Sequence, residues 1–192
     1  MLVLCKLLQV KPEIPPVFSP QTFSLPNGSE VFVRQLLPED KKLLADGFEQ
    51  LSPETIRKRF MNLRKGFNEK ELVSLTELDG IDHFALGASV NEDGQTKGIG
   101  VARYVRDKIE THKAELAIVI VDKYQGMGLG SFLMQNISEV AFESGIEEFT
   151  GTLERSNLGM QKLLKKMKGF ETQLDTEATY LQLKANLKKW KS

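Results

Sequence analysis

Apolar residues in the first half of the globular chain recur at helical spacing. After a strand-like alternation at residues 30–35, leucines and phenylalanines follow every three or four positions behind the helix-start signals Pro38-Glu39-Asp40 and Ser52-Pro53-Glu54. The pattern predicts one strand and then three helices, the second ending at Gly66 and the third covering residues 68–78.

The period of the apolar positions changes after residue 80. Residues 83–90 and 98–105 read as paired strands around a turn at residues 91–94, and residues 113–121 form a continuous apolar run typical of a central strand. A helix, a strand, a further helix and a hairpin are then predicted over residues 128–144, 148–153, 157–167 and 171–183. Early helices followed by a mixed sheet that two more helices interrupt predict an α/β (α+β) fold.

The N-terminal segment departs from this regularity. Five of the seven prolines lie between residues 11 and 29. Because proline removes a backbone donor and disfavours helix before it, we expect an irregular Pro-rich segment over residues 1–29 and a globular domain over residues 30–192. The apolar residues 1–10 include Lys6, lack signal-peptide features and are about half a bilayer span, so we expect a cytoplasmic protein without membrane contact.

Charge and cysteine content narrow the possible functions. Lys+Arg and Asp+Glu both number 26, so the basic excess usual in a nucleic-acid-binding protein is missing. Cys5 is the only cysteine, which excludes an intramolecular disulfide and a thiolate metal site. We therefore expect neither a nucleic-acid partner nor a bound metal.

One segment combines features of an anion site. A buried strand leads into Gln125-Gly126-Met127-Gly128-Leu129-Gly130-Ser131 and then directly into a helix. Glycines at three of five positions let backbone N–H groups point into one concavity. The helix start adds unsatisfied donors and the positive end of the helix dipole, so the expected ligand is a diphosphate. The spacing matches neither a P-loop nor a dinucleotide fingerprint. A turn that merely joins strand and helix closely is the alternative.

These residues resemble a known family. Gln125-x-x-Gly128-x-Gly130 is similar to the Gln/Arg-x-x-Gly-x-Gly/Ala signature with which GNAT acyltransferases cradle the pyrophosphate of acetyl-CoA. Asn157, followed by Lys168-Gly169-Phe170, is similar to the Asn…Gly-Phe segment of that family. The resemblance covers roughly residues 30–183 and implies the GNAT fold, with a mixed central sheet of about six or seven strands flanked by helices.

A narrower resemblance lies upstream. Residues 51–60 and 75–86 are similar to the acetyltransferase domain of bacterial Pat-type protein lysine acetyltransferases. The resemblance implies an acetyl-CoA-dependent N-acetyltransferase in which an amine, favoured to be a protein lysine, attacks directly in a ternary complex. A small-molecule amine as acceptor, and a catalytically idle acyl-CoA-binding sensor module, are the alternatives. Regulation by an additional domain, as in Pat-type enzymes, is not expected here, and the oligomeric state is open.

The resemblance also implies residue roles. Glu115, the only carboxylate in residues 114–121, corresponds to a glutamate that deprotonates the amine. A solvent-facing glutamate, or one paired with Lys113 or Arg103, is the alternative. In the family this strand splays from its neighbour after the base, so the backbone of Ile118, Val119 and Ile120 would supply the oxyanion donor and pair with the pantetheine arm.

Other roles implied by the family remain divided between candidates. Asn157 would bind the cofactor arm, serve as a helix N-cap, or do both. Lys165 stands where many members have a tyrosine that protonates the leaving thiolate, so either no protein acid is needed or Tyr124 or Ser131 serves. Acceptor pockets in this family are built from the early helices and the last hairpin, where possible contributors are Arg57, Arg59, Glu54 and Tyr180.

Overall fold

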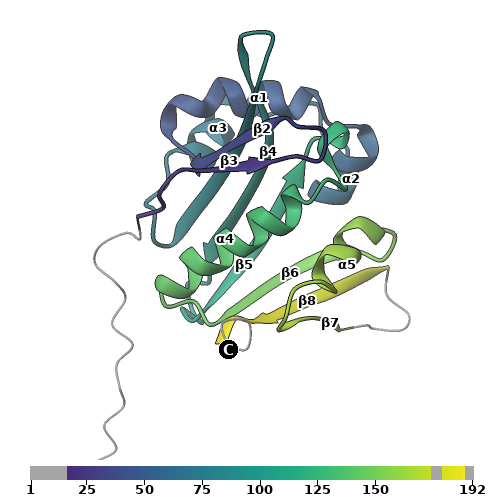
Figure 1. Ribbon diagram of the computed structural model, residues 1–192. Coiled ribbons are helices and arrows are strands. Elements are labelled where there is room, and N and C mark those ends of the chain that lie inside the picture. The colour runs from purple at the N-terminus through teal and green to yellow at the C-terminus, as the bar shows by residue number, and fades with distance from the viewer. Residues whose placement is uncertain (1–16, 174–178, 189–192) are drawn as a thin grey trace, which may run out of the picture.

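A mixed sheet organises the residues that the computed structural model describes, 17–173 and 179–188 (Figure 1). Eight strands run in the order β1-β2-β3-β4-β5-β6-β8-β7. Their bounds are β1 Gln21–Ser24, β2 Glu30–Gln35, β3 His83–Glu92, β4 Gln95–Arg106, β5 Lys113–Ile120, β6 Glu148–Glu154, β7 Phe170–Gln173 and β8 Tyr180–Asn186. Neighbours pair antiparallel except β5 and β6, which are parallel. The predicted mixed α/β architecture is confirmed.

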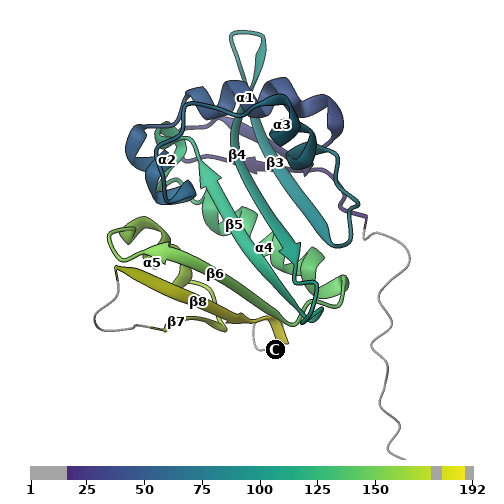
Figure 2. The same cartoon turned by 180° about the vertical axis from the view of Figure 1, so that it is seen from behind.

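Helices cover both faces of this sheet. The helices α1 (Lys41–Glu49), α2 (Pro53–Phe60) and α3 (Glu69–Thr76) lie on one face, and α4 (Leu129–Glu143) crosses the other, as Figures 1 and 2 show. The short helix α5 (Leu158–Leu164) follows β6 and contacts β7. No helix within the described ranges is long and apolar enough to span a membrane.

Local sequence signals set several of these boundaries. The Ser52 hydroxyl accepts the Thr55 N–H at 3.2 Å and Pro53 occupies the first helical position, so α2 begins where predicted. The helix ends at Phe60 rather than at Gly66, because Met61 adopts a left-handed conformation with φ 56°. The hairpin between β3 and β4 is also tighter than predicted: Asp93 and Gly94 alone form the turn, both with positive φ, as the type I′ geometry requires.

The expected irregular N-terminal segment contains a strand. β1 pairs antiparallel with β2 through the turn at residues 25–29, where the Gly28 N–H donates to the Leu25 carbonyl at 2.9 Å. With β1, the sheet has one strand more than the six or seven expected. Residues 21–24 can pair as a strand because the neighbouring prolines lie on either side of them and none lies within. Cys5 and Lys6 lie outside the described residues.

The core lies between α4 and the sheet. Leu133, Ile137 and Ala141, on the predicted apolar face of α4, are fully buried. Tyr104 of β4 is buried beneath them, and its hydroxyl bonds to Ser144 at 3.0 Å and donates to the Ile81 carbonyl at 3.1 Å. Burial raises the pKa of the Tyr104 hydroxyl to about 12. This packing fixes β5 and the start of α4 relative to each other.

Candidate functional site

The parallel strands β5 and β6 pair over only three positions and then diverge. Lys113, Ala114 and Glu115 of β5 are paired with residues 148–150 of β6, and no pairing follows, although β5 continues to Ile120 and β6 to Glu154. Figure 2 shows the two strands opening into a V from this point. The splay that the family resemblance implies is therefore present, with Glu115 at its apex.

Pairing with β4 decides which backbone groups of β5 face this gap. The Val121 N–H donates to the Ile99 carbonyl of β4 at 2.8 Å, and alternate residues of an antiparallel pair share the same orientation. The backbone of Val119 is therefore directed at β4, whereas that of Ile118 and Ile120 is directed at β6. Of the three residues expected to face the cofactor, only these two have backbone groups in the gap.

The glycine-rich turn lies at the open end of the V. Gly126 and Gly128 have φ values of 75° and 92°, which side-chain-bearing residues rarely adopt. The helix α4 starts immediately afterwards without a side-chain cap, and the N–H groups of residues 126–130 have no hydrogen-bond acceptor within the described part of the chain. Unsatisfied donors at a helix N-terminus form an anion site, so the residues present fit a diphosphate.

Packing restricts this turn from both sides. A Cβ atom on Gly128 would lie 3.2 Å from Cζ of Phe23, whose ring packs against that of Phe132 with centroids 4.8 Å apart and a tilt of 33°. A Cβ atom on Gly130 would lie 3.3 Å from Cδ1 of Ile120 and 3.4 Å from Leu163. The contribution of Phe23 is missed by sequence reasoning, because β1 lies in the segment expected to be irregular.

The start of α2 is hydrogen-bonded to the same turn. The carboxylate of Asp122, which lies in the 3₁₀ turn Asp122–Tyr124, accepts the Ser52 N–H at 2.9 Å, the Ser52 hydroxyl at 2.7 Å and the Thr55 hydroxyl at 2.7 Å. Desolvation alone would raise the pKa of Asp122, but these hydrogen bonds lower it. Gln125 Nε2 donates to the Ile120 carbonyl at 2.9 Å and Thr55 Oγ1 at 3.3 Å.

The side chain of Gln125 therefore joins α2 to β5, and its backbone N–H donates to the Asp122 carbonyl at 3.1 Å. Unlike residues 126–130, Gln125 thus offers no free backbone N–H to a phosphate. Ser131, like Gln125 predicted at the cofactor site, is half-buried in the first turn of α4, and its N–H donates to the Gly128 carbonyl at 3.0 Å. Met127 and Leu129 contribute N–H groups, while their side chains pack toward the core.

Glu115 has an exposed side chain at the apex of the V. It forms no ion pair with Lys113, which bonds to Glu110 at 2.8 Å and approaches Glu148 at 3.7 Å. Arg103 does not pair with it either, since that guanidinium donates to the Leu75 carbonyl at 3.1 Å. The cation whose charge interacts with Glu115 is Arg59 of α2.

The middle of α2 and the end of β6 are connected across the gap. Arg57 forms an ion pair with Glu154, which is buried and also accepts the Ser156 hydroxyl at 2.8 Å. These bonds, the one from Ser156 foremost, lower the pKa of Glu154. With Asp122 holding its first turn, α2 is thus fixed over the open V. No local pattern predicts this arrangement, because its partners come from distant parts of the chain.

The remaining predicted residues have identifiable structural partners. Asn157 Oδ1 accepts the Met160 N–H at 3.0 Å, so Asn157 is the N-cap of α5, and its role at the cofactor arm stays a prediction. Tyr124 is buried, and its hydroxyl donates to Glu92, toward the β3–β4 hairpin rather than the gap. Burial is the main reason that the pKa of Tyr124 is raised. Lys165 is exposed at the C-terminal end of α5.

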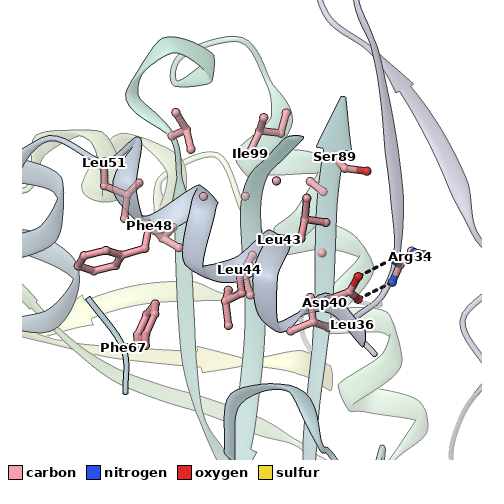
Figure 3. Close-up of a pocket in the computed structure, with 18 of the residues that line it drawn as sticks. Arg34, Leu36, Asp40, Leu43, Leu44, Phe48, Leu51, Phe67, Ser89 and Ile99 are labelled. Atoms are coloured by element: carbon pink, nitrogen blue, oxygen red, sulfur yellow. Dashed lines mark hydrogen bonds and ion pairs between the residues drawn. The ribbon is translucent and has the colours of Figure 1, made fainter. Parts of the chain in front are cut away.

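An apolar pocket lies elsewhere, between α1 and strands β3 and β4. Its volume is about 60 Å³, and Figure 3 shows Leu43, Leu44 and Phe48 lining it from α1. The charged groups in its lining, Arg34 and Asp40, bond to each other at 2.6 Å. It contains neither Glu115 nor the glycine turn, and its two charged side chains pair with each other, so we place the candidate active site in the V.

A splayed pair of parallel strands beside an uncapped, glycine-rich helix start is the arrangement that the resemblance to acyl-CoA-dependent acyltransferases implies. A sequence model of the acetyltransferase (GNAT) family matches residues 53–170. The chain belongs to this family, and it is an N-acetyltransferase that uses acetyl-CoA.

Relatives extend the similarity over most of the chain. Acetyltransferase PA5475 of Pseudomonas aeruginosa is 32% identical over 80% of this chain and 82% of its own length. Acetyltransferase Pat of Mycolicibacterium smegmatis is 32% identical over 73% of this chain, which spans only 41% of that protein. The crystal structure of the GNAT domain of S. lividans PAT has a TM-score of 0.77 at 26% identity, covering 87% of this chain and 96% of its own.

A more distant structure carries the cofactor. The yncA protein of Salmonella typhimurium, solved with acetyl-CoA, shares the fold with a TM-score of 0.64 at 15% identity, covering 82% of this chain and 94% of its own.

Proposed function

We propose that this protein acetylates a lysine side chain of a protein, with Glu115 as the general base and direct attack of the amine on the thioester. The observation that carries the proposal is the position of Glu115. It is the last residue of β5 paired with β6, and its exposed side chain adjoins the gap that the free edge of β5 borders. Base and gap are thus next to each other.

The free backbone groups are suited to bind two parts of acetyl-CoA, the pyrophosphate and the pantetheine arm. The N–H groups of residues 126–130, which have no acceptor among the described residues, would hold the pyrophosphate. The even-numbered backbone groups of β5 would pair with the pantetheine amides as an added strand would. The Ile118 N–H would then donate to the thioester oxygen and stabilise the negative charge that develops there.

The amine must lose a proton before or during attack. A lysine ammonium has a pKa near 10.4, so deprotonation at pH 7.5 costs about 4 kcal/mol. The carboxylate of Glu115 would accept this proton, directly or through water, since its side chain is open to solvent.

The leaving thiolate needs no protein acid in this scheme. Tyr124, one candidate, donates its hydroxyl proton to Glu92 away from the gap. We therefore assign protonation of the thiolate to solvent.

Similarity to Pat-type proteins supports a protein acceptor. The match to the S. lividans PAT domain covers 96% of that domain. The loop after α2 also exposes Met61 and Leu63, with 40% and 77% of their surface accessible, next to the helix that covers the gap. Exposed apolar side chains at the rim of a site are suited to contact a polypeptide.

The test is acetyl-CoA turnover with a panel of amines and lysine-containing proteins, followed by mass spectrometry of the products. Glu115→Gln is expected to lower kcat by about 10²- to 10⁴-fold, the usual contribution of a general base. Thermal stabilisation by acetyl-CoA should persist, because the carboxylate does not contact the phosphates. Glu143→Gln, at an exposed position at the end of α4, is the matched control. Unchanged turnover in Glu115→Gln would remove this residue from the mechanism.

A further inference from the structure

Arg59 is the arginine without a hydrogen-bonding partner among the described residues. All seven arginines of the chain lie in the described ranges. Arg34, Arg57, Arg64 and Arg106 pair with carboxylates, Arg103 donates to a carbonyl, and Arg155 also has a partner. Arg59 only lies over the ring of Phe60, with its guanidinium carbon 4.9 Å from the ring centroid.

The surroundings of Arg59 make this lack of a partner unfavourable. Its side chain is half-buried, and desolvation lowers its pKa, with Glu115 opposing the effect and Arg64 adding to it. A guanidinium that loses water without gaining an acceptor carries an uncompensated desolvation penalty. Such a group is well placed to receive an anion from outside the chain.

A second guanidinium adds to the positive charge. Arg103 of β4 is only 6% exposed and interacts electrostatically with Arg59. It has no carboxylate partner in residues 17–173 and 179–188. Its register partner is Ala117, so its backbone position is diagonal to Glu115 on the same face of the sheet. The local charge of Glu115, Arg59 and Arg103 is positive, and it becomes more positive when Glu115 accepts a proton.

We propose that the acceptor carries a carboxylate near the reacting amine and that Arg59 binds this carboxylate. The proposal rests on the proposed function, since it takes Glu115 as the position of the amine. A guanidinium presents a planar fork of donors that matches a carboxylate in two parallel hydrogen bonds. The carboxylate replaces the missing counter-charge and orients the amine toward Glu115. Either an acidic side chain beside a lysine or the carboxylate of a small amino acid has this chemistry.

The experiment compares matched acceptors. One arm uses two peptides with a single lysine flanked by glutamate or by glutamine, and the other uses an amino acid and its amide. Acetylation is measured as kcat/KM, and peptide binding is measured separately by fluorescence anisotropy in the presence of CoA. The variants are Arg59→Gln, Arg59→Lys and, as a control for loss of an exposed positive charge, Lys108→Gln.

Wild type should prefer the carboxylate-bearing member of one arm by at least about tenfold, the effect of a charge-assisted hydrogen bond. Arg59→Gln should lose this preference yet acetylate the neutral member within about threefold of wild type. Arg59→Lys should retain part of the preference, because it keeps the charge without the fork. Lys108→Gln should retain all of it. The arm that shows the preference identifies the source of the carboxylate.

Two outcomes would overturn the proposal. One is equal use of both members of each pair by wild type, and the other is an equal loss on both members in Arg59→Gln, which would make Arg59 a residue that positions Glu115. The binding measurement separates this failure from that of the proposed function. If the acidic peptide binds in an Arg59-dependent way but is not acetylated, the carboxylate site at Arg59 is supported. The proposal that the enzyme acetylates a protein lysine is then refuted.

Discussion

Replacing Gly128 by alanine tests whether the glycine turn is the cofactor site. Gly128 has a φ of 92°, and a Cβ atom there would lie 3.2 Å from Phe23 Cζ. The left-handed conformation costs a residue with a side chain about 1–2 kcal/mol. The strain is relieved only if the turn leaves the conformation in which the N–H groups of residues 126–130 lack internal acceptors. We therefore expect weaker binding of acetyl-CoA as well as lower stability.

The expected magnitudes follow from linkage. Acetyl-CoA at about 100 times its Kd stabilises the folded state by about 2.7 kcal/mol, and a tenfold weaker Kd removes roughly half of this. For a chain of this length, 1 kcal/mol shifts Tm by about 2–4 °C. Gly128→Ala should lower Tm by about 2–8 °C without ligand and show a ligand-induced shift that is about 3–6 °C smaller than that of wild type.

Gly94→Ala is the matched control. Gly94 has a φ of 77° and nothing within 4 Å of an added Cβ, but it lies at the tip of the β3–β4 hairpin. It should reproduce the loss of stability and keep the full response to acetyl-CoA, both read by scanning fluorimetry. A full acetyl-CoA shift in Gly128→Ala, or an equal reduction in both variants, would refute the assignment of the phosphate site.

Two further predictions concern carboxylates of the scaffold. Burial is the largest single effect on the pKa of Asp40 and acts to raise it. Hydrogen bonds from Arg34 and from the Leu37 N–H, together with the charge of Arg34, outweigh burial and hold this pKa below its usual value. A lowered carboxyl pKa stabilises the fold above the unfolded-state value of about 3.9, and this contribution is lost as the pH falls through the folded-state value. Urea unfolding of Asp40→Asn should therefore show a deficit at pH 7 that shrinks below pH 4, and a constant deficit would contradict this account. Asp122→Asn should raise the acceptor KM by about fivefold, equivalent to about 1 kcal/mol, with a smaller change for acetyl-CoA. Equal changes in both KM values would contradict the role of Asp122 in holding α2.

Local patterns predicted the parts of the fold that local physics determines. The apolar run of β5, the glycine turn and the amphipathic α4 follow one another in sequence, and each is recognisable from its own residues. The predicted end of α2 was wrong because Met61 ends the helix in the left-handed conformation that glycine usually adopts there. No glycine at this position marks the end in the sequence. β1 was missed because flanking prolines hid a four-residue strand that is stabilised by pairing with β2.

The candidate site was predictable only where its groups are close in sequence. Glu115 and the glycine turn lie on one strand-turn-helix unit, so spacing could relate them. Arg59 and Glu154 come from elements before and after this unit, and only the order of strands in the sheet brings them to the gap. Which backbone groups of β5 are free likewise depends on pairing register, which residue types do not encode.

Helix α2 is therefore the element on which the two halves of the proposed reaction depend. Its first turn is held by Asp122, directly before the glycine turn, and its last turn carries Arg59, whose charge interacts with Glu115. An ion pair from Arg57 fixes its middle to β6. Because one rigid helix of 8 residues spans about 12 Å, a displacement at Asp122 is transmitted to Arg59. A change confined to the cofactor end should thus alter acceptor use, which is why the acceptor KM is the decisive readout for Asp122→Asn.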